Sequence, residues 1–245
     1  MPSNKFYITT AIDYLNGPPH IGHVFEKILT DCLARYHRTK GEEVFFLTGS
    51  DEHGFKMQQV AETEGISPQE LVDRNVGDFQ ALKEKLNLSF DRFIRTTDAD
   101  HIALSQELWK ECKARGDLYL KKYQGLYCTG CESFKKESDL VGGKCPNHNV
   151  VPEEVEEENW FFKLTNYENK IRELITNREL KIYPEHRAKE ILNVLDELGD
   201  FSVSRPKEKL TWGIDIPDDQ TQVMYVWFDA LANYLSGVGK FSDGT

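Results

Sequence analysis

The junction between a β-rich run and a long helix near the N-terminus constrains the fold most. Lys5–Thr9 (KFYIT) has strand character, and a helical pattern runs from Ile21 to Lys40 and ends at Gly41. Between the two lies the segment PHIGH at residues 19–23. A strand followed at once by a helix is the unit from which parallel α/β sheets are built, so this junction favours that class.

The PHIGH segment places two histidines at a helix N-terminus, where unpaired backbone N–H groups and the positive end of the helix dipole favour a phosphate. His20 and His23 lie on nearly one face of the helix. Both imidazoles can therefore donate hydrogen bonds as charge develops on phosphate oxygens. Gly22 between them lets a nucleotide lie against the backbone. The alternative is that the histidines only decorate the start of the helix.

Further alternation of strand and helix signals extends this pattern. Val44–Leu47 (VFFL) is a short apolar run typical of a buried parallel strand, and a polar loop at 48–54 (TGSDEHG) follows its C-terminal end, where α/β sheets bind ligands. The capping sequence SPQE at 67–70 predicts a helix that reaches about Leu86, and Asp98–Arg115 predicts another. We therefore predict that residues 1–116 form part of a doubly wound, parallel, Rossmann-like sheet.

A cysteine group marks a change of pattern after Asp117, where short strands and clustered glycines replace the alternation. Cys128-x-x-Cys131 is followed, after thirteen residues, by Cys145-x-x-His148. Two ligand pairs at this spacing predict a zinc knuckle, and four protein ligands leave no position for water, so the zinc should be structural. The alternative is a set of free thiols beside a chance histidine.

The remaining sequence predicts a small inserted domain followed by a return to the first pattern. The acidic run 153–158 is interpreted as a solvated strand edge. Cys32 and Cys112, each alone in a helix, are expected in the core. We expect helices over 165–178, opened by a capping box of Thr165 and Glu168, and over 185–198, then a strand over 223–227 and a helix over 229–236. The inserted domain is placed at 117–222, with the knuckle at 128–148, and the second half of the first domain begins at 223–245.

The composition limits location and partners. The 245 residues carry 30 Lys and Arg against 41 Asp and Glu, a net charge of −11, which argues against non-specific coating of nucleic acid. Any RNA contact is therefore expected to be local. No apolar run approaches the roughly 18 residues that span a bilayer, and the N-terminus has no signal pattern, so we expect a cytoplasmic location without membrane contact.

Three segments resemble the methionyl-tRNA synthetase family of class I aminoacyl-tRNA synthetases. Residues 11–23 (AIDYLNGPPHIGH) match the HIGH motif in all four letters, 48–54 match the family's loop after the second strand, and 225–234 (YVWFDALANY) match the segment that forms the methionine side-chain pocket. The likeness runs from Lys5 to about Gly239. It implies the family's nucleotide-binding fold, with the zinc knuckle in its inserted connective peptide and His148 in place of a fourth cysteine.

The resemblance implies a role for each matched residue. His20, Gly22 and His23 would contact ATP, and the two histidines would be catalytic. Asp51 falls at the position whose carboxylate receives the α-ammonium group of L-methionine, a role that needs an acid at the C-terminal end of a strand. Leu231 stands where the family has a proline or a leucine-like residue, so it discriminates weakly. The implied methionine-binding set is Ile12, Tyr14, Asp51, Trp227, Ala230, Leu231 and Tyr234.

The implied reaction is attack of the methionine carboxylate on the α-phosphate of ATP, which Mg²⁺ accompanies, and then transfer to the terminal adenosine of tRNA(Met). The sequence has no counterpart of the family's KMSKS loop or anticodon-binding domain. We therefore expect a truncated methionine–tRNA ligase that is inactive by itself. The alternatives are a class I synthetase for another amino acid, a small-molecule nucleotidyltransferase and a non-catalytic, zinc-stabilised RNA-binding fragment.

Overall fold

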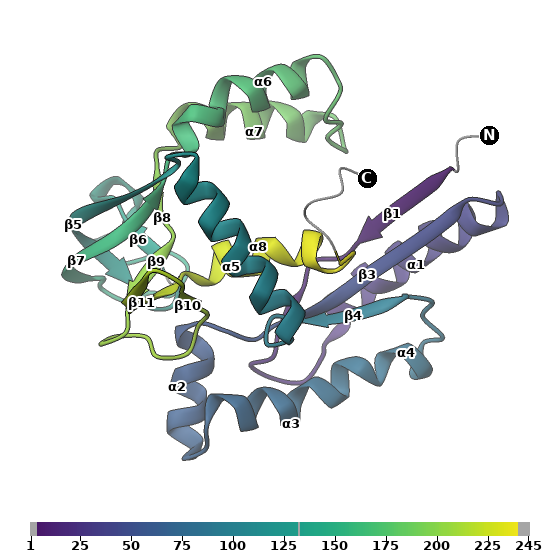
Figure 1. Ribbon diagram of the computed structural model, residues 1–245, viewed down its shortest axis with the longest axis horizontal. Helices are drawn as coiled ribbons and strands as arrows, with labels where there is room; N and C mark the ends of the chain where they lie inside the picture. Colours follow the sequence, from purple (N-terminus) through teal and green to yellow (C-terminus); the bar gives the residue numbers. More distant parts are fainter. Residues whose placement is uncertain (1–3, 132, 240–245) are drawn as a thin grey trace.

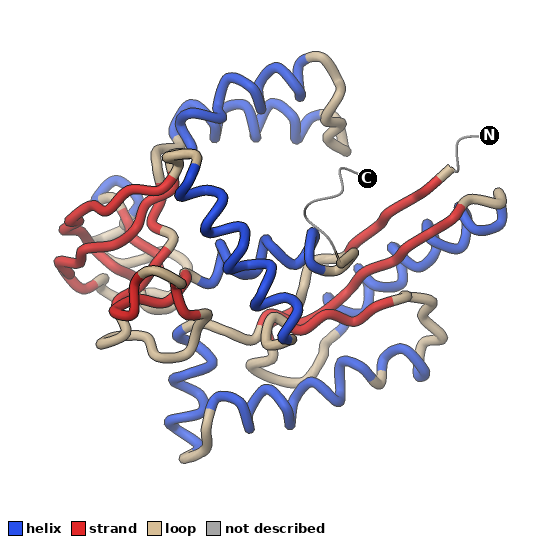
Figure 2. Tube along the Cα trace, viewed as in Figure 1, coloured by secondary structure: helices blue, strands red, loops and turns tan. Residues whose placement is uncertain are grey.

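The computed structural model describes residues 4–131 and 133–239. The predicted domains also include residues 1–3, 132 and 240–245, which lie outside the described residues. The strands fall into two groups, and helices surround both (Figure 2). One group is a parallel sheet, and the other consists of two antiparallel sheets.

The parallel sheet confirms the predicted Rossmann-like class. Its long strand β3 pairs in parallel with all three other strands of the sheet. The helices of this half pack around the sheet, and α1 runs beside β3 (Figure 1). The elements are β1 (Lys5–Thr9), β2 (Asp13–Tyr14), α1 (Ile21–Thr39), β3 (Glu43–Asp51), α2 (Phe55–Glu64), α3 (Pro68–Gln80), α4 (Leu82–Lys85), β4 (Arg92–Arg95) and α5 (Ala99–Ala114).

The segment 48–51, predicted as loop, is instead the end of β3. Leu47–Ser50 pair with β4, so the polar residues satisfy their backbone hydrogen bonds in the sheet. A Cβ at Gly49 would lie 2.1 Å from the carbonyl oxygen of Ile94, so only glycine allows β4 to approach this closely. The sequence pattern missed β4 because this short strand has no apolar alternation.

The helices after β3 partly follow the prediction. Ser67 and Glu70 form the expected capping box, with Pro68 in the first turn of α3. The predicted helix to Leu86 is divided into α3 and α4 at Ala81, and α2 was not predicted. Gly65, which ends α2 with a φ of +69°, sharply separates α2 from α3.

The second part of the chain forms two antiparallel sheets and a helical hairpin. The larger sheet has the order β6-β5-β7-β8, and the smaller has the order β10-β11-β9. The predicted boundary between 222 and 223 falls within β11. The elements are β5 (Leu118–Cys128), β6 (Ser133–Lys135), the 3₁₀ helix η1 (Glu137–Asp139), β7 (Glu153–Phe162), the 3₁₀ helix η2 (Leu164–Tyr167), α6 (Glu168–Thr176), α7 (His186–Glu197), β8 (Phe201–Ser202), β9 (Ser204–Pro206), β10 (Asp215–Ile216), β11 (Asp219–Met224) and α8 (Val226–Ser236).

Of three local predictions in this part, one was confirmed and two were wrong. The acidic run 153–158 lies in β7 and pairs only with β5, because β8 pairs with β7 only at Phe161 and Phe162. This stretch is therefore a largely exposed strand edge, as predicted, although Glu157 is buried beside Lys209 at 2.8 Å. Thr165 does not cap a helix, because it lies in η2 and its hydroxyl donates to Asp200. The strand expected over 223–227 ends at Met224, and α8 begins at Val226.

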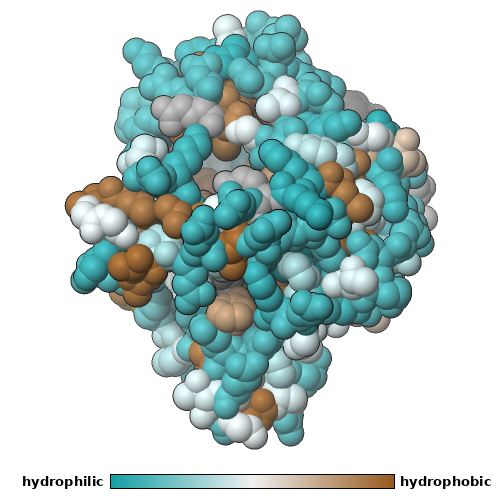
Figure 3. All heavy atoms as spheres, turned by 90° about the vertical axis from the view of Figure 1, so that its left-hand side faces the viewer, coloured by the Kyte–Doolittle hydropathy of each residue, from teal (hydrophilic) through white to brown (hydrophobic). Residues whose placement is uncertain are grey.

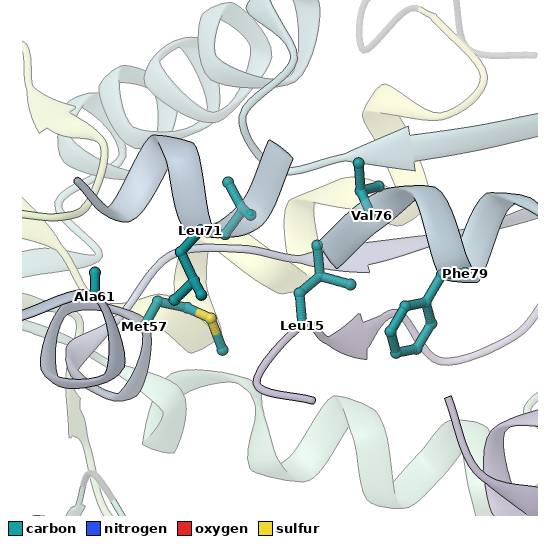
Figure 4. Close-up of a cluster of buried hydrophobic side chains, with 7 residues drawn as sticks. Leu15, Met57, Ala61, Leu71, Val76 and Phe79 are labelled. Carbon is teal, nitrogen blue, oxygen red and sulfur yellow. The ribbon is translucent and has the colours of Figure 1, made fainter. Parts of the chain in front are cut away.

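Separate apolar clusters stabilise the first part and join it to the second. One cluster joins α2 and α3 to Leu15, which follows β2 (Figure 4). Another centres on Trp109 of α5, whose ring lies edge-on to Phe228 of α8 at 5.3 Å and to Trp160 of β7 at 6.1 Å. This second cluster fixes the antiparallel sheets and α8 against α5.

The outer face of the antiparallel part is mostly hydrophilic, with hydrophobic side chains gathered in a few places (Figure 3). Cys32 lies exposed on α1 and Cys112 is partly buried, so the prediction of two core cysteines was wrong for Cys32. Among the described residues, no helix is both long and apolar enough to cross a bilayer.

Candidate active site and metal centre

The two histidines of the PHIGH segment cap α1 with their own side chains. His20 is the N-cap, and its Nδ1 accepts the backbone N–H of Gly22 at 3.1 Å. The Nδ1 of His23 accepts the backbone N–H of His20 at 3.1 Å, and the two rings stack at 3.8 Å. Burial lowers the pKa of His23 below its ordinary value. Because Nδ1 is an acceptor in both rings, each neutral ring carries its proton on Nε2, where it can donate to a ligand.

The loop before α1 is tied to that helix by two acid contacts. Glu26 accepts the backbone N–H of Ala11 at 2.8 Å, and Lys27 forms a buried ion pair with Asp13. Breaking the Lys27–Asp13 pair would leave an uncompensated buried charge, so this pair in particular holds the loop against α1. Ile12 is half-buried within this loop.

Asp51 ends β3 at the C-terminal end of the parallel sheet, beside β2, which precedes the PHIGH segment. It is only 4% exposed and is the register partner of Tyr14 in β2. Burial raises the pKa of Tyr234 on α8, and the negative charges of Glu26 and Asp51 add to that rise. The Tyr7 hydroxyl donates to the carbonyl of Tyr234 at 2.7 Å. Three predicted residues, Tyr14, Asp51 and Tyr234, are therefore brought together near the C-terminal end of β3.

Helix α8 presents the rest of the predicted methionine set. Trp227 and Leu231 are 55% and 54% exposed, and Ala230 and Tyr234 are half-buried. Trp227 and Leu231 line a largely apolar cavity of about 670 Å³ between α8 and the antiparallel part of the chain. Ala230 and Tyr234 do not line it, so the structure divides the predicted set between this cavity and the C-terminal end of β3. The cavity's other lining residues are Cys131, Phe134, Phe161, Leu164, Leu198, Asp200, Phe201, Ser202, Arg205 and Tyr225.

The four predicted zinc ligands come together in the loops around β6. Their ligand atoms all lie within 4.8 Å of one another, with Cys131 Sγ 3.5 Å from Cys145 Sγ and 3.3 Å from His148 Nδ1. A tetrahedral zinc with Zn–S of about 2.3 Å and Zn–N of about 2.0–2.1 Å keeps its ligand atoms about 3.5–3.8 Å apart. The cluster therefore fits a closed zinc site.

Two further observations support the fit. A hydrogen bond from His148 lowers the pKa of Cys145 to about 6, which favours the thiolate that binds a metal. A Cβ at Gly130 would lie 2.5 Å from the ring of His148, so glycine is needed for the ring to reach the cysteines.

Sequence reasoning gave no role to Asp229, His53 or His101, which the structure joins in one buried cluster. The Oδ2 of Asp229 lies 2.6 Å from Nδ1 of His53, and Oδ1 lies 2.6 Å from Nε2 of His101. The available signal was helical periodicity, because Asp229 shares the face of α8 that carries Phe228, Ala232 and Asn233, and all of them are buried.

Comparisons with known proteins agree with this arrangement. The sequence profile of the family described as tRNA synthetases class I (M) matches residues 6–151 and 148–245. The methionine–tRNA ligase of Rhizobium meliloti is 46% identical over 99% of this chain, which covers 48% of that enzyme. The chain thus spans about half the length of this relative.

Solved structures of a similar protein show the same fold. A Mycobacterium tuberculosis methionyl-tRNA synthetase in complex with methionyl-adenylate gives a TM-score of 0.92 at 42% identity, over 99% of this chain and 48% of that chain. The apo form of the M. tuberculosis protein gives 0.79 at 40% identity, over 98% of this chain and 46% of that chain. The present fold is therefore closer to the adenylate complex than to the apo form.

Proposed function

We propose, from the premise that the chain belongs to the class I tRNA synthetase (M) family, that it supplies the ATP- and methionine-binding half of a methionine–tRNA ligase. The observation that carries the proposal is the placement of the His20 and His23 rings and of Asp51 at the same end of one parallel sheet. A nucleotide site and a carboxylate that can hold an ammonium group are then close enough to act on two substrates together.

In the proposed reaction, Asp51 pairs with the α-ammonium group of methionine and directs its carboxylate towards ATP. A carboxylate oxygen forms a bond to the α-phosphorus, the bond between the α-phosphorus and the oxygen that bridges the α- and β-phosphates breaks, and pyrophosphate leaves with that oxygen. The Nε2–H groups of His20 and His23 donate to phosphate oxygens as negative charge develops on them, and Gly22 leaves room for the nucleotide. Mg²⁺ bound with ATP supplies further charge neutralisation.

The methionine side chain is proposed to lie against α8. Trp227, Ala230, Leu231 and Tyr234, with Ile12 and Tyr14, offer aromatic and aliphatic surface that suits a thioether. The knuckle residues Cys128, Cys131, Cys145 and His148 would hold a structural zinc, because four ligands close its coordination shell. The transfer of the methionyl group to tRNA(Met), and a place of action in the cytoplasm, are proposed for the longer protein.

Amino-acid-dependent ATP–pyrophosphate exchange tests the proposal in the complete enzyme. We expect methionine to support exchange at least about a hundredfold faster than leucine, isoleucine or valine. Exchange that depends on another amino acid would favour a different class I synthetase. The matched variant Asp51→Asn keeps the size of the side chain but loses its charge, so it should abolish the methionine-dependent signal.

A further inference from the structure

The buried carboxylate of Asp229 bridges two histidines that are distant in sequence. Asp229 and His101 are 0% exposed, and His53 is 5% exposed. Both carboxylate oxygens are used, one by His53 from the segment after β3 and the other by His101 from α5, each at 2.6 Å. Asp229 itself lies on α8, so a single side chain joins three elements.

The hydrogen-bond directions in this cluster are set by the carboxylate. An ionised carboxylate only accepts, so the rings donate from Nδ1 of His53 and from Nε2 of His101. The remaining Nδ1 of His101 then accepts from the hydroxyl of Ser236, 2.8 Å away and two helical turns after Asp229. Burial alone would raise the pKa of Asp229, but the two histidines hold it below its ordinary value. The cluster is thus a satisfied network that fixes α8 at two points.

The segment that carries His53 is also held from its other side. The indole N–H of Trp212 donates to the carbonyl of Glu52 at 2.6 Å, and the backbone N–H of Gly54 donates to the carbonyl of Trp212 at 3.1 Å. His53 follows Asp51 by two residues. The hydrogen bond from His53 to Asp229 therefore fixes the position of α8 relative to Asp51.

Helix α8 has two faces with different tasks. Its buried face carries Asp229 and Ser236, and the opposite face carries Trp227 and Leu231. Rotating or sliding the helix would move both faces together because a helix is a rigid element. The bridge consequently fixes where the proposed methionine-contacting side chains stand relative to Asp51.

We infer that Asp229 is a positioning residue for amino-acid recognition, which acts through His53 and His101 and does not touch the substrate. The inference rests on the proposed methionine site. In this inference, the Asp229–His53 hydrogen bond aligns the two halves of that site. One half is Asp51, which holds the ammonium group, and the other is α8, which holds the methionine side chain. A misplacement of about 1 Å in such a site can cost on the order of a hundredfold in rate.

The test uses steady-state ATP–pyrophosphate exchange in the complete enzyme, with thermal unfolding of each variant. Asp229→Asn and His53→Ala should each raise the KM for methionine at least tenfold and change the KM for ATP less than twofold. His53→Asn should recover most of the loss, because its amide N–H occupies the place of Nδ1. Phe228→Leu is the control, since it weakens the core on the same face of α8 without touching the bridge.

The KM for methionine and the melting temperature together distinguish a positioning role of Asp229 from a purely structural one. If Asp229→Asn and His53→Ala lower the melting temperature as Phe228→Leu does and leave the KM for methionine within twofold, the bridge is only structural and the inference is wrong. If Asp229→Asn does not fold, the His53→Ala and His53→Asn pair decides alone, because Asp229 keeps His101. A wild-type enzyme without methionine-dependent exchange would overturn the proposed function instead.

Discussion

At the scale of single residues, the histidines of the PHIGH segment combine two tasks. Each ring uses Nδ1 to satisfy an N–H group at the start of α1, and this leaves the proton on Nε2. The cap therefore sets the tautomer that a phosphate ligand requires. A residue that only accepted from the backbone would preserve the helix start and lose the donor.

His23→Asn separates these tasks in the complete enzyme. Its amide oxygen can still accept from the N–H of His20, but it has no donor at the position of Nε2. We expect adenylate formation to slow by about 10²-fold, the typical cost of one lost donor to developing charge. Methionine affinity should change little. Rapid quench of a single turnover and methionine titration measure the two quantities, and a comparable loss in affinity would contradict the assigned role.

The lowered pKa of His23 predicts a pH dependence of stability. Because burial favours the neutral ring in the folded state, the unfolded chain takes up a proton first, at the ordinary histidine pKa of about 6.5. The contribution of the neutral ring is complete above that pH and is lost as the pH falls towards the lower folded-state value. Urea unfolding between pH 7.5 and 5 should show a smaller decline for His23→Asn than for the wild type. An equal decline in the free energy of unfolding would show that His23 does not contribute to its pH dependence.

At the scale of elements, the knuckle and the parallel sheet have separate cores. The zinc ligands lie in the loops next to β5 and β6, whereas the apolar cluster around Met57 and Leu71 belongs to α2 and α3. Damage to one should therefore leave the other folded at first.

The purified chain should contain about one zinc per molecule, and Gly130→Ala should weaken its retention. The added methyl group would meet the ring of His148 at 2.5 Å, so the ring must move away from the cysteines. Gly199→Ala is the control, because a Cβ there meets nothing within 4 Å. Metal analysis and release to a chelator measure the effect. Equal retention of zinc in both variants would remove His148 from the ligand set.

At the scale of the whole molecule, two helices expose large apolar side chains. Ile21 and Phe25 of α1 are 81% and 68% exposed, and Trp227 and Leu231 of α8 are more than half exposed. Large apolar side chains left this exposed favour burial by a substrate or by further polypeptide. The relatives, of which the chain covers 48% or less, have further chain that could cover them.

The isolated chain should therefore lack exchange activity close to that of a complete enzyme. The chain spans about half the length of its relatives, and we expect groups from the rest of such an enzyme to compensate the pyrophosphate charge, each electrostatic group being worth about 10²-fold. Adding a fragment that begins at the position matching Thr245 should restore exchange. The same fragment mixed with the Asp51→Asn chain should not. Full activity of the chain alone would refute the prediction of a truncated enzyme.

The sequence alone determined the features that depend on local spacing. The strand-to-helix junction at PHIGH, the capping box at Ser67 and Glu70, and the four ligands of the knuckle are close in sequence, so chain geometry brings each set together. Tertiary structure decided what depends on long-range contact. β4 exists because β3 accepts it beside Gly49, and Asp229 meets His53 and His101 only after α5 and α8 pack together. The physical reason is that a buried charge needs hydrogen-bonding partners, and here the fold supplies them from residues that are distant in sequence. Local spacing in the sequence does not indicate which distant residues will be in contact.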